Sequence, residues 1–108
     1  MKHPDPQDVQ RLIDIDAIQT LKYRYAALCD QGYEAEGLMA LFTEDAVWDG
    51  GAFGVHDGRE AIGRFFAGTG QTVSFAMHYI LSPIIEIAGD RAAGSWMLWQ
   101  SLVLRDTQ

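Results

Sequence analysis

The sequence has few of the features that mark several large classes of protein. A single cysteine, Cys29, among 108 residues excludes an intrachain disulfide and is typical of a reducing compartment. Basic residues are scarce, since 8 Lys and Arg stand against 15 Asp and Glu, and the net charge of −7 argues against nucleic acid as a partner. No run approaches the roughly 18 apolar residues that span a bilayer, so we expect no membrane partner.

The amino-terminal region also lacks targeting features. The first dozen residues are polar and have no apolar core of a signal peptide, so we expect a soluble, cytoplasmic protein. Residues 1–13, which include Pro4 and Pro6, predict a flexible lead-in to a single domain over residues 14–108. With 48% hydrophobic residues, the chain can build a core and is not a disordered tail.

The first predicted element is an amphipathic helix that begins near Asp14. Apolar residues recur at a spacing of three and four, which is typical of a helix with one buried stripe: Ile15, Ile18, Leu21, Tyr25 and Leu28. Gly32 predicts its end. Asp30 lies off the stripe, and we expect a frayed last turn to direct its carboxylate into a pocket.

The middle of the chain predicts short elements. Residues 33–42 predict a second short helix, residues 46–49 begin a strand, and the glycine-rich residues after them predict a turn or short hairpin. Asp57, followed three residues later by Glu60, is typical of a capped helix start, here for a helix over residues 59–67. Gly68 and Gly70 predict the end of that helix.

From Thr72 the apolar period changes to two. Residues 72–87 and 91–104 predict two long strands joined by a Gly89–Asp90 turn, with a bulge or an edge at Pro83. Pairing from that turn places His78 opposite Ser101, or opposite Gln100 if Pro83 forms a bulge. Three helices followed by a long antiparallel hairpin predict an α+β fold, with helices packed on one face of a curved sheet.

Tyr25, Asp30 and His78 are the candidate catalytic residues. An aspartate can hold an imidazole in one tautomer, so that the ring can take a proton from carbon or pass one to a leaving hydroxyl. A neighbouring tyrosine can donate a hydrogen bond to a carbonyl or to the departing oxygen. The same three residues also fit purely structural roles, as a core aromatic, a turn aspartate and a strand histidine. Spacing alone does not decide between catalytic and structural roles, because the contact between helix and strand is inferred.

Three stretches then carry a resemblance to a known family. They are AIQTLKYRYAALCDQGYEAEGLMALFTEDAVWDGG, GVHDGREAIGRFF and MHYILSPIIEIAGDRAAGSWMLW, and together they cover about residues 14 to 104. The chain resembles the SnoaL-like branch of the nuclear transport factor 2-like superfamily. Within it, the chain is similar to the bile-acid dehydratase, scytalone dehydratase and hexachlorocyclohexane dehydrochlorinase families.

The resemblance implies a fold, a chemistry and a site. The fold is a cone-shaped α+β barrel, in which a strongly bent mixed sheet surrounds a pocket that helices close. The enzymes eliminate water or HCl without a metal or an organic cofactor. Their helix aspartate and strand histidine match Asp30 and His78, and the tyrosine five residues before the aspartate matches Tyr25.

The same resemblance implies two features beyond the site. Family members continue for two further strands after the hairpin, which a sequence ending at Gln108 does not contain. Further chain or a partner could supply that wall, or the pocket could be open. Members also commonly pair through the sheet, so we expect a homodimer or a higher homo-oligomer, and an apolar edge strand would favour such association.

The remaining candidates concern the pocket and its ligands. Small-molecule sites are mostly apolar with few polar groups, so some large side chains that are primarily core should also contact substrate: Trp48, Phe53, Phe65, Trp96 and, opposite the histidine, Gln100. His56 and Asp57 could form a second catalytic pair, but Asp57 fits a helix cap better. Three scattered histidines without HxH or CxxC spacing predict no metal site.

Two functions follow from these observations. The first is a cofactor-independent lyase or isomerase, dehydratase-like, that acts on a small hydrophobic hydroxy-carbonyl compound of polycyclic or steroid-like shape. The alternative is a non-catalytic module of the same fold that binds a small apolar ligand or dimerises as an accessory subunit. The fold hosts many functions, so the site must decide between the two.

Overall fold

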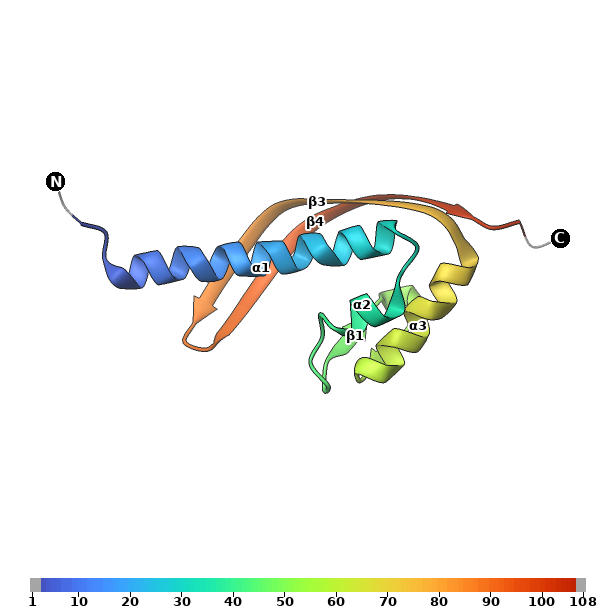
Figure 1. The fold of residues 1–108 in the computed structure, drawn as a ribbon, viewed down its shortest axis with the longest axis horizontal. Coiled ribbons are helices and arrows are strands. Elements are labelled where there is room, and N and C mark those ends of the chain that lie inside the picture. The colour runs from blue at the N-terminus through green and yellow to red at the C-terminus, as the bar shows by residue number, and fades with distance from the viewer. Residues whose placement is uncertain (1–2, 107–108) are drawn as a thin grey trace.

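The computed structural model describes residues 3–106, which form helices and strands in an α+β arrangement. The long β3–β4 hairpin arches over α1, and α3 descends from one end of the arch (Figure 1). The elements are, in chain order, α1 (Pro6–Asp30), α2 (Ala35–Met39), β1 (Val47–Asp49), the 3₁₀ helix η1 (Gly51–Phe53), β2 (Val55–Asp57), α3 (Arg59–Thr72), β3 (Val73–Ala88) and β4 (Arg91–Leu104). The α+β fold class is therefore confirmed.

The first helix begins earlier than the apolar pattern predicts. It starts at Pro6, so residues 6–13 are helical and the sequence-based assignment of residues 1–13 to a flexible lead-in is wrong for that part. Asp5 caps the helix by accepting a hydrogen bond from the Gln7 amide at 2.8 Å, and proline suits the first helical position. These first turns are exposed, although Val9, Leu12 and Ile13 recur at helical spacing within them.

The end of α1 is a Schellman motif. Gly32 has φ 101°, its amide bonds the Cys29 carbonyl at 3.2 Å, and the Tyr33 amide bonds the Leu28 carbonyl at 3.1 Å. The predicted end at Gly32 is confirmed. The expected fraying is wrong, because α1 stays helical through Asp30 and these two bonds close its last turn.

The short elements between α1 and α3 form as predicted. Leu38 on α2 is fully buried, and Phe42 after it packs against the same core. Strands β1 and β2 pair antiparallel with Trp48 opposite His56. This small hairpin thus presents Trp48 toward the helices.

Helix α3 differs from its prediction at both ends. Asp57 lies in β2, and the cap position is Gly58 without a side-chain cap, so the predicted Asp57 cap is wrong. The Arg59 amide bonds the Glu44 carbonyl at 3.1 Å instead. The helix also runs past Gly68 and Gly70 to Thr72.

The β3–β4 hairpin follows its predicted register. Ala88 pairs with Arg91 across the Gly89–Asp90 turn, where Gly89 has φ 63°. The register shifts between Leu81 and Ile84, which confirms the bulge at Pro83 and places His78 opposite Gln100.

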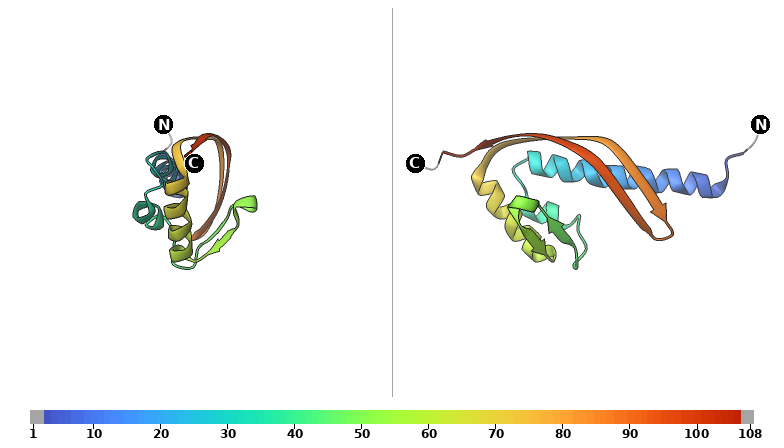
Figure 2. Two further views of the ribbon diagram at one scale, coloured as in Figure 1. Left: turned by 90° about the vertical axis from the view of Figure 1, so that its right-hand side faces the viewer. Right: turned by 180° about the vertical axis from the view of Figure 1, so that it is seen from behind.

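The core lies where the end of α1 meets α2, α3 and the start of β3. Its largest fully buried side chains are Cys29, Leu38, Ile62 and Phe66. Seen along its long axis, the molecule has the helices on one side and the two hairpins curving on the other (Figure 2). Within residues 3–106, β1–β2 and β3–β4 form two separate sheets, and no helix is long and apolar enough to cross a membrane.

Candidate active site

A largely apolar cavity of about 730 Å³ opens beside this core. Ligand pockets usually have volumes of roughly 300–1,000 Å³, so this cavity suits a small molecule. Its apolar wall includes Trp48, Phe53, Phe65, Phe66, Leu98 and Leu102. Polar side chains also line it: Tyr25, Tyr33, Asp49, Arg64, Thr69, Thr72, His78 and Gln100. The cavity thus has the composition of a small-molecule site.

Asp30 and His78 are in direct contact. Asp30 Oδ1 lies 2.7 Å from His78 Nδ1 and accepts a second hydrogen bond from the His78 backbone amide at 2.9 Å. A carboxylate only accepts, so in the neutral ring Nδ1 carries the proton and Nε2 presents a lone pair. Among residues 3–106, Nε2 has no hydrogen-bond partner. The geometry therefore leaves Nε2 of His78, which lines the cavity, able to accept a proton.

The carboxylate lies behind the imidazole rather than in the cavity. Asp30 does not line the cavity, so the expectation that it points into a pocket is wrong. Its side chain is 31% exposed, whereas that of His78 is 6% exposed. The regular end of α1 turns Asp30 away from Tyr25 and toward β3, where both of its bonds are made.

Tyr25 contributes a hydroxyl to the cavity. Its oxygen accepts a hydrogen bond from Trp48 Nε1 at 3.3 Å, and its ring packs against Phe42 and Phe66. Burial raises the pKa of Tyr25, so the phenol stays protonated at neutral pH. It can then donate a hydrogen bond to a ligand.

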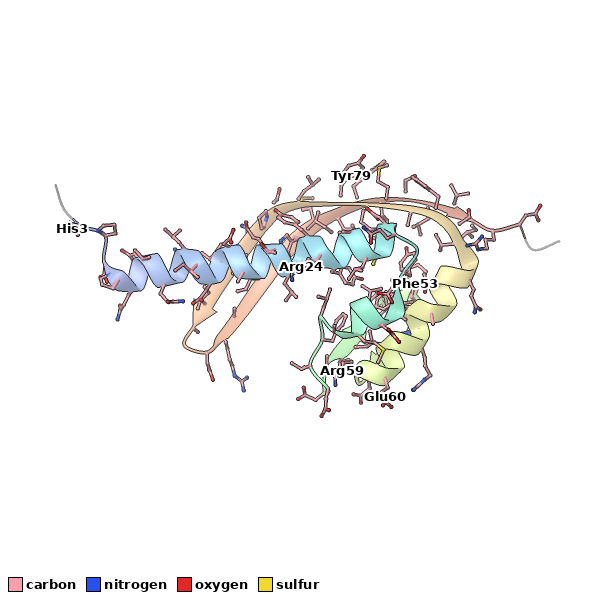
Figure 3. The ribbon with its side chains drawn as sticks, viewed as in Figure 1. His3, Arg24, Phe53, Arg59, Glu60 and Tyr79 are labelled. Atoms are coloured by element: carbon pink, nitrogen blue, oxygen red, sulfur yellow. The ribbon has the colours of Figure 1, made fainter. Side chains whose placement is uncertain are left out.

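Aromatic rings form the opposite wall. Phe65 lies 4.8 Å from the Trp48 ring and 4.2 Å from the His56 ring, between centroids. His56 Nε2 lies 3.2 Å from the Phe53 carbonyl, which fixes the imidazole against this wall and away from Asp57 as a catalytic partner. Phe53 lies beneath the arch (Figure 3).

Trp96 is the one predicted substrate-binding residue outside the cavity lining. It shares the inner face of β4 with Gln100 but lies nearer the hairpin turn, opposite the β3 bulge. Its ring centroid is 5.2 Å from Lys22 Nζ, and its buried Nε1 has no hydrogen-bond partner in the described part of the chain. Trp48, Phe53, Phe65 and Gln100 line the cavity at the predicted positions.

Cys29 is not a candidate nucleophile. It is fully buried, and burial raises the pKa of its thiol to about 12. The reactive thiolate is therefore absent at neutral pH. Within residues 3–106 there is also no cluster of three or more His, Cys, Asp or Glu side chains that could hold a metal ion.

Tyr33 is a polar cavity residue that sequence reasoning missed. The sequence places it at the start of a short helix, whereas the structure buries it in the cavity wall beside His78. A signal was present, because a Schellman glycine at position 32 makes the next residue the one that folds back on the helix. The signal is easily overlooked, because tyrosine rarely adopts the positive φ that this position requires.

Comparison with known protein families gives one decisive match. The family model for the SnoaL-like domain matches residues 10–108, nearly the whole chain. The chain belongs to the SnoaL-like family. Members of this family and fold include dehydratases, cyclases and isomerases. No curated protein matches the chain.

Solved structures agree with the SnoaL-like assignment. Three from Novosphingobium aromaticivorans are similar: a candidate aromatic ring hydroxylase (27% identity, TM-score 0.81), a candidate scytalone dehydratase (20%, 0.82) and a protein described as NTF2-like with a cystatin-like fold (27%, 0.74). They cover 87%, 91% and 86% of this chain. In turn, this chain spans 68%, 66% and 64% of theirs, about two thirds of their length.

Proposed function

We propose that this SnoaL-like domain is a dehydratase-like lyase or isomerase whose own side chains perform the chemistry without a cofactor. Its substrate would be a small hydrophobic hydroxy-carbonyl compound of polycyclic or steroid-like shape. The contact that supports the proposal most directly is that between Asp30 and His78, at 2.7 Å beside an aromatic cavity. The candidate scytalone dehydratase shares the fold, and its name adds a precedent for this class of reaction.

In the proposed mechanism, His78 Nε2 takes the proton from the carbon next to the substrate carbonyl. The electron pair of that C–H bond moves onto the carbonyl oxygen, where Tyr25 donates a hydrogen bond to the developing enolate. When the enolate collapses, the C–O bond to the β-hydroxyl breaks and the hydroxyl takes the proton from the imidazolium to leave as water. Return of the proton to another carbon gives isomerisation instead.

Asp30 acts through His78 in this scheme. Its carboxylate holds Nδ1 protonated and stabilises the positive charge that the ring gains when Nε2 takes a proton. The His78 backbone amide bonds the same oxygen, which keeps the carboxylate in place when the ring changes its charge. Asp30 is therefore a positioning residue.

A binding module without turnover is the second candidate function. The observation that favours it is Gln100, which pairs with His78 across the hairpin and also lines the cavity. An amide can orient the imidazole or a ligand, but it cannot carry charge. The cavity alone would suffice for this function.

Replacing Asp30 with Asn separates the two functions. A panel of β-hydroxy ketones on bicyclic and steroid skeletons is incubated with the protein, and elimination is followed by the absorbance of the conjugated enone. We expect Asp30→Asn to lower kcat by about 10²–10⁴-fold. The Asp30–His78 dyad then lacks the carboxylate that holds Nδ1 protonated and stabilises the charged ring. The affinity of a non-reacting ketone should change little.

The exposed Asp16 on the same helix provides the control. Asp16→Asn removes one negative charge far from the dyad and should leave kcat unchanged. Turnover that survives Asp30→Asn would contradict the mechanism. Tight ligand binding by the unaltered protein without any turnover would instead support the binding module.

A further inference from the structure

Tyr33 adopts a backbone conformation that its residue type rarely accepts. It follows Gly32 at the end of α1 and has φ 58°, in the left-handed region that favours glycine. Glycine or asparagine would fit this turn with less strain. Strained residues with large side chains are often found where the side chain has a functional role.

Contacts from two elements, α3 and β3, hold the Tyr33 ring in place. It stacks on Phe66 of α3 at 6.1 Å between centroids, with 14° between the ring planes. It meets the His78 ring of β3 edge-on at 6.0 Å and 77°. The turn itself lies against Gly70, where a Cβ atom would come within 2.7 Å of the Gly32 carbonyl oxygen. Tyr33 is therefore fixed between α1, α3 and the proposed base.

The Tyr33 side chain ends in a hydroxyl group at the cavity wall. Tyr33 is only 6% exposed and lines the cavity. Among residues 3–106, its hydroxyl makes no hydrogen bond. Burial raises the pKa of Tyr33 to about 12, so the phenol keeps its proton at neutral pH. The hydroxyl is not enclosed by protein atoms, because only Trp96 Nε1 is a buried side-chain polar atom without a partner in the described part of the chain. Its donor is therefore accessible to a ligand oxygen in the cavity.

We propose that the Tyr33 hydroxyl binds the ligand by donating a hydrogen bond to one of its oxygen atoms beside His78. The cavity would then select compounds that carry a carbonyl or hydroxyl oxygen over hydrocarbons of the same shape. This inference rests on the proposed function only for the cavity as the ligand site. It holds both for an enzyme and for a binding module.

The test compares two bicyclic probes that differ by one oxygen atom. α-Tetralone carries a ketone, and tetralin is the corresponding hydrocarbon. Their affinities are measured through the tryptophan fluorescence, to which the cavity residue Trp48 contributes. We expect Tyr33→Phe to weaken α-tetralone binding by about 3- to 10-fold, the usual effect of one hydrogen bond, and to leave tetralin unchanged.

Two further variants keep the result interpretable. Tyr23→Phe on the exposed face of α1 should alter neither affinity. In Tyr25→Phe, which removes the donor of the proposed mechanism but keeps Tyr33 intact, part of the preference for α-tetralone over tetralin should persist, and this holds even if Tyr33→Phe proves unstable. Loss of the whole preference in Tyr25→Phe would assign the donor to Tyr25 and overturn the proposal.

The remaining outcomes also decide the question. Equal weakening of both probes by Tyr33→Phe would indicate a packing role and would overturn the proposal, as would no effect on either probe. Failure of the unaltered protein to bind α-tetralone would overturn it too. Failure of the proposed reaction has a different signature, because turnover would be absent while the oxygen-dependent binding remained.

Discussion

The ionisable side chains beside the dyad are held neutral by burial. The Cys29 thiol is fully buried and its pKa is raised to about 12, while the pKa of Tyr33 is raised to about 12 by the same cause. A group with a raised pKa in the folded state keeps its proton after the unfolded chain has lost it. The unfolded state then gains stability from ionisation that the folded state does not share.

Stability should therefore fall in alkaline solution. Between about pH 9 and pH 12 the unfolded chain binds fewer protons than the folded one at Cys29, so the free energy of unfolding should decrease as the pH rises. Urea unfolding at a series of pH values measures this slope. In Cys29→Ala the slope should be shallower, although the tyrosines keep part of it. Identical slopes would contradict the raised thiol pKa.

The positions of most site residues could be predicted, whereas that of Tyr33 could not. Helical spacing and hairpin register are local rules, and they placed Tyr25 on a buried stripe and His78 opposite a polar residue. The Gly32 turn indicates that Tyr33 folds back on the helix, but it does not indicate the contacts with Phe66 and His78, which lie far away in sequence. Local preference gives no access to such a contact.

At the scale of elements, α3 shows how packing overrides a local signal. Gly68 and Gly70 predict a helix end, yet the helix continues to Thr72. Gly70 is needed for another reason, since the turn at Gly32 approaches it too closely for a side chain. Gly68 faces open space, because a Cβ atom at this position would meet no neighbouring atom within 4 Å. The two glycines thus have different roles within one helix.

This difference gives a matched pair of substitutions. Gly68→Ala should raise the free energy of unfolding by about 0.5–1 kcal/mol, because alanine restricts the unfolded chain and suits a helix. Gly70→Ala should lower it, because the new methyl group would lie 2.7 Å from the Gly32 carbonyl oxygen. Thermal unfolding of both variants tests the pair. Equal gains in stability would show that the turn can move aside.

The β3–β4 hairpin was the most predictable element. A two-residue turn and one proline set its register, and both act within the hairpin itself. The early start of α1 was missed because Pro4 and Pro6 favour a flexible segment. Capping by Asp5 indicates such a helix more reliably than apolar period does.

At the scale of the whole molecule, the outer face of the β3–β4 hairpin is strongly apolar. Cross-strand pairs place six large side chains on this face: Phe75, Tyr79, Leu81, Met97, Trp99 and Val103. All are exposed, and Figure 3 shows Tyr79 pointing away from the arch. Soluble monomers rarely expose a continuous apolar patch of this kind.

We propose that this face pairs with a second copy of the chain. Sedimentation velocity should then give a dimer or a higher oligomer for the unaltered protein. Trp99→Lys, which places a charge at an exposed position in the middle of the face, should shift the protein to a monomer. Leu12→Lys on the exposed part of α1 serves as the control and should leave the oligomer intact. A monomer at all concentrations would contradict the proposal.

The bonds of Asp30 also bear on how the family could lose its chemistry during evolution. Its carboxylate anchors the end of α1 to β3 through the backbone amide of residue 78, a group that every residue except proline provides. A descendant without activity would still gain stability from an aspartate at this position. The imidazole of His78 takes no part in this bond between Asp30 and the backbone amide. If His78 is the base that we propose, replacement of the histidine in a related sequence therefore indicates loss of the reaction, whereas an aspartate that persists alone indicates only common descent.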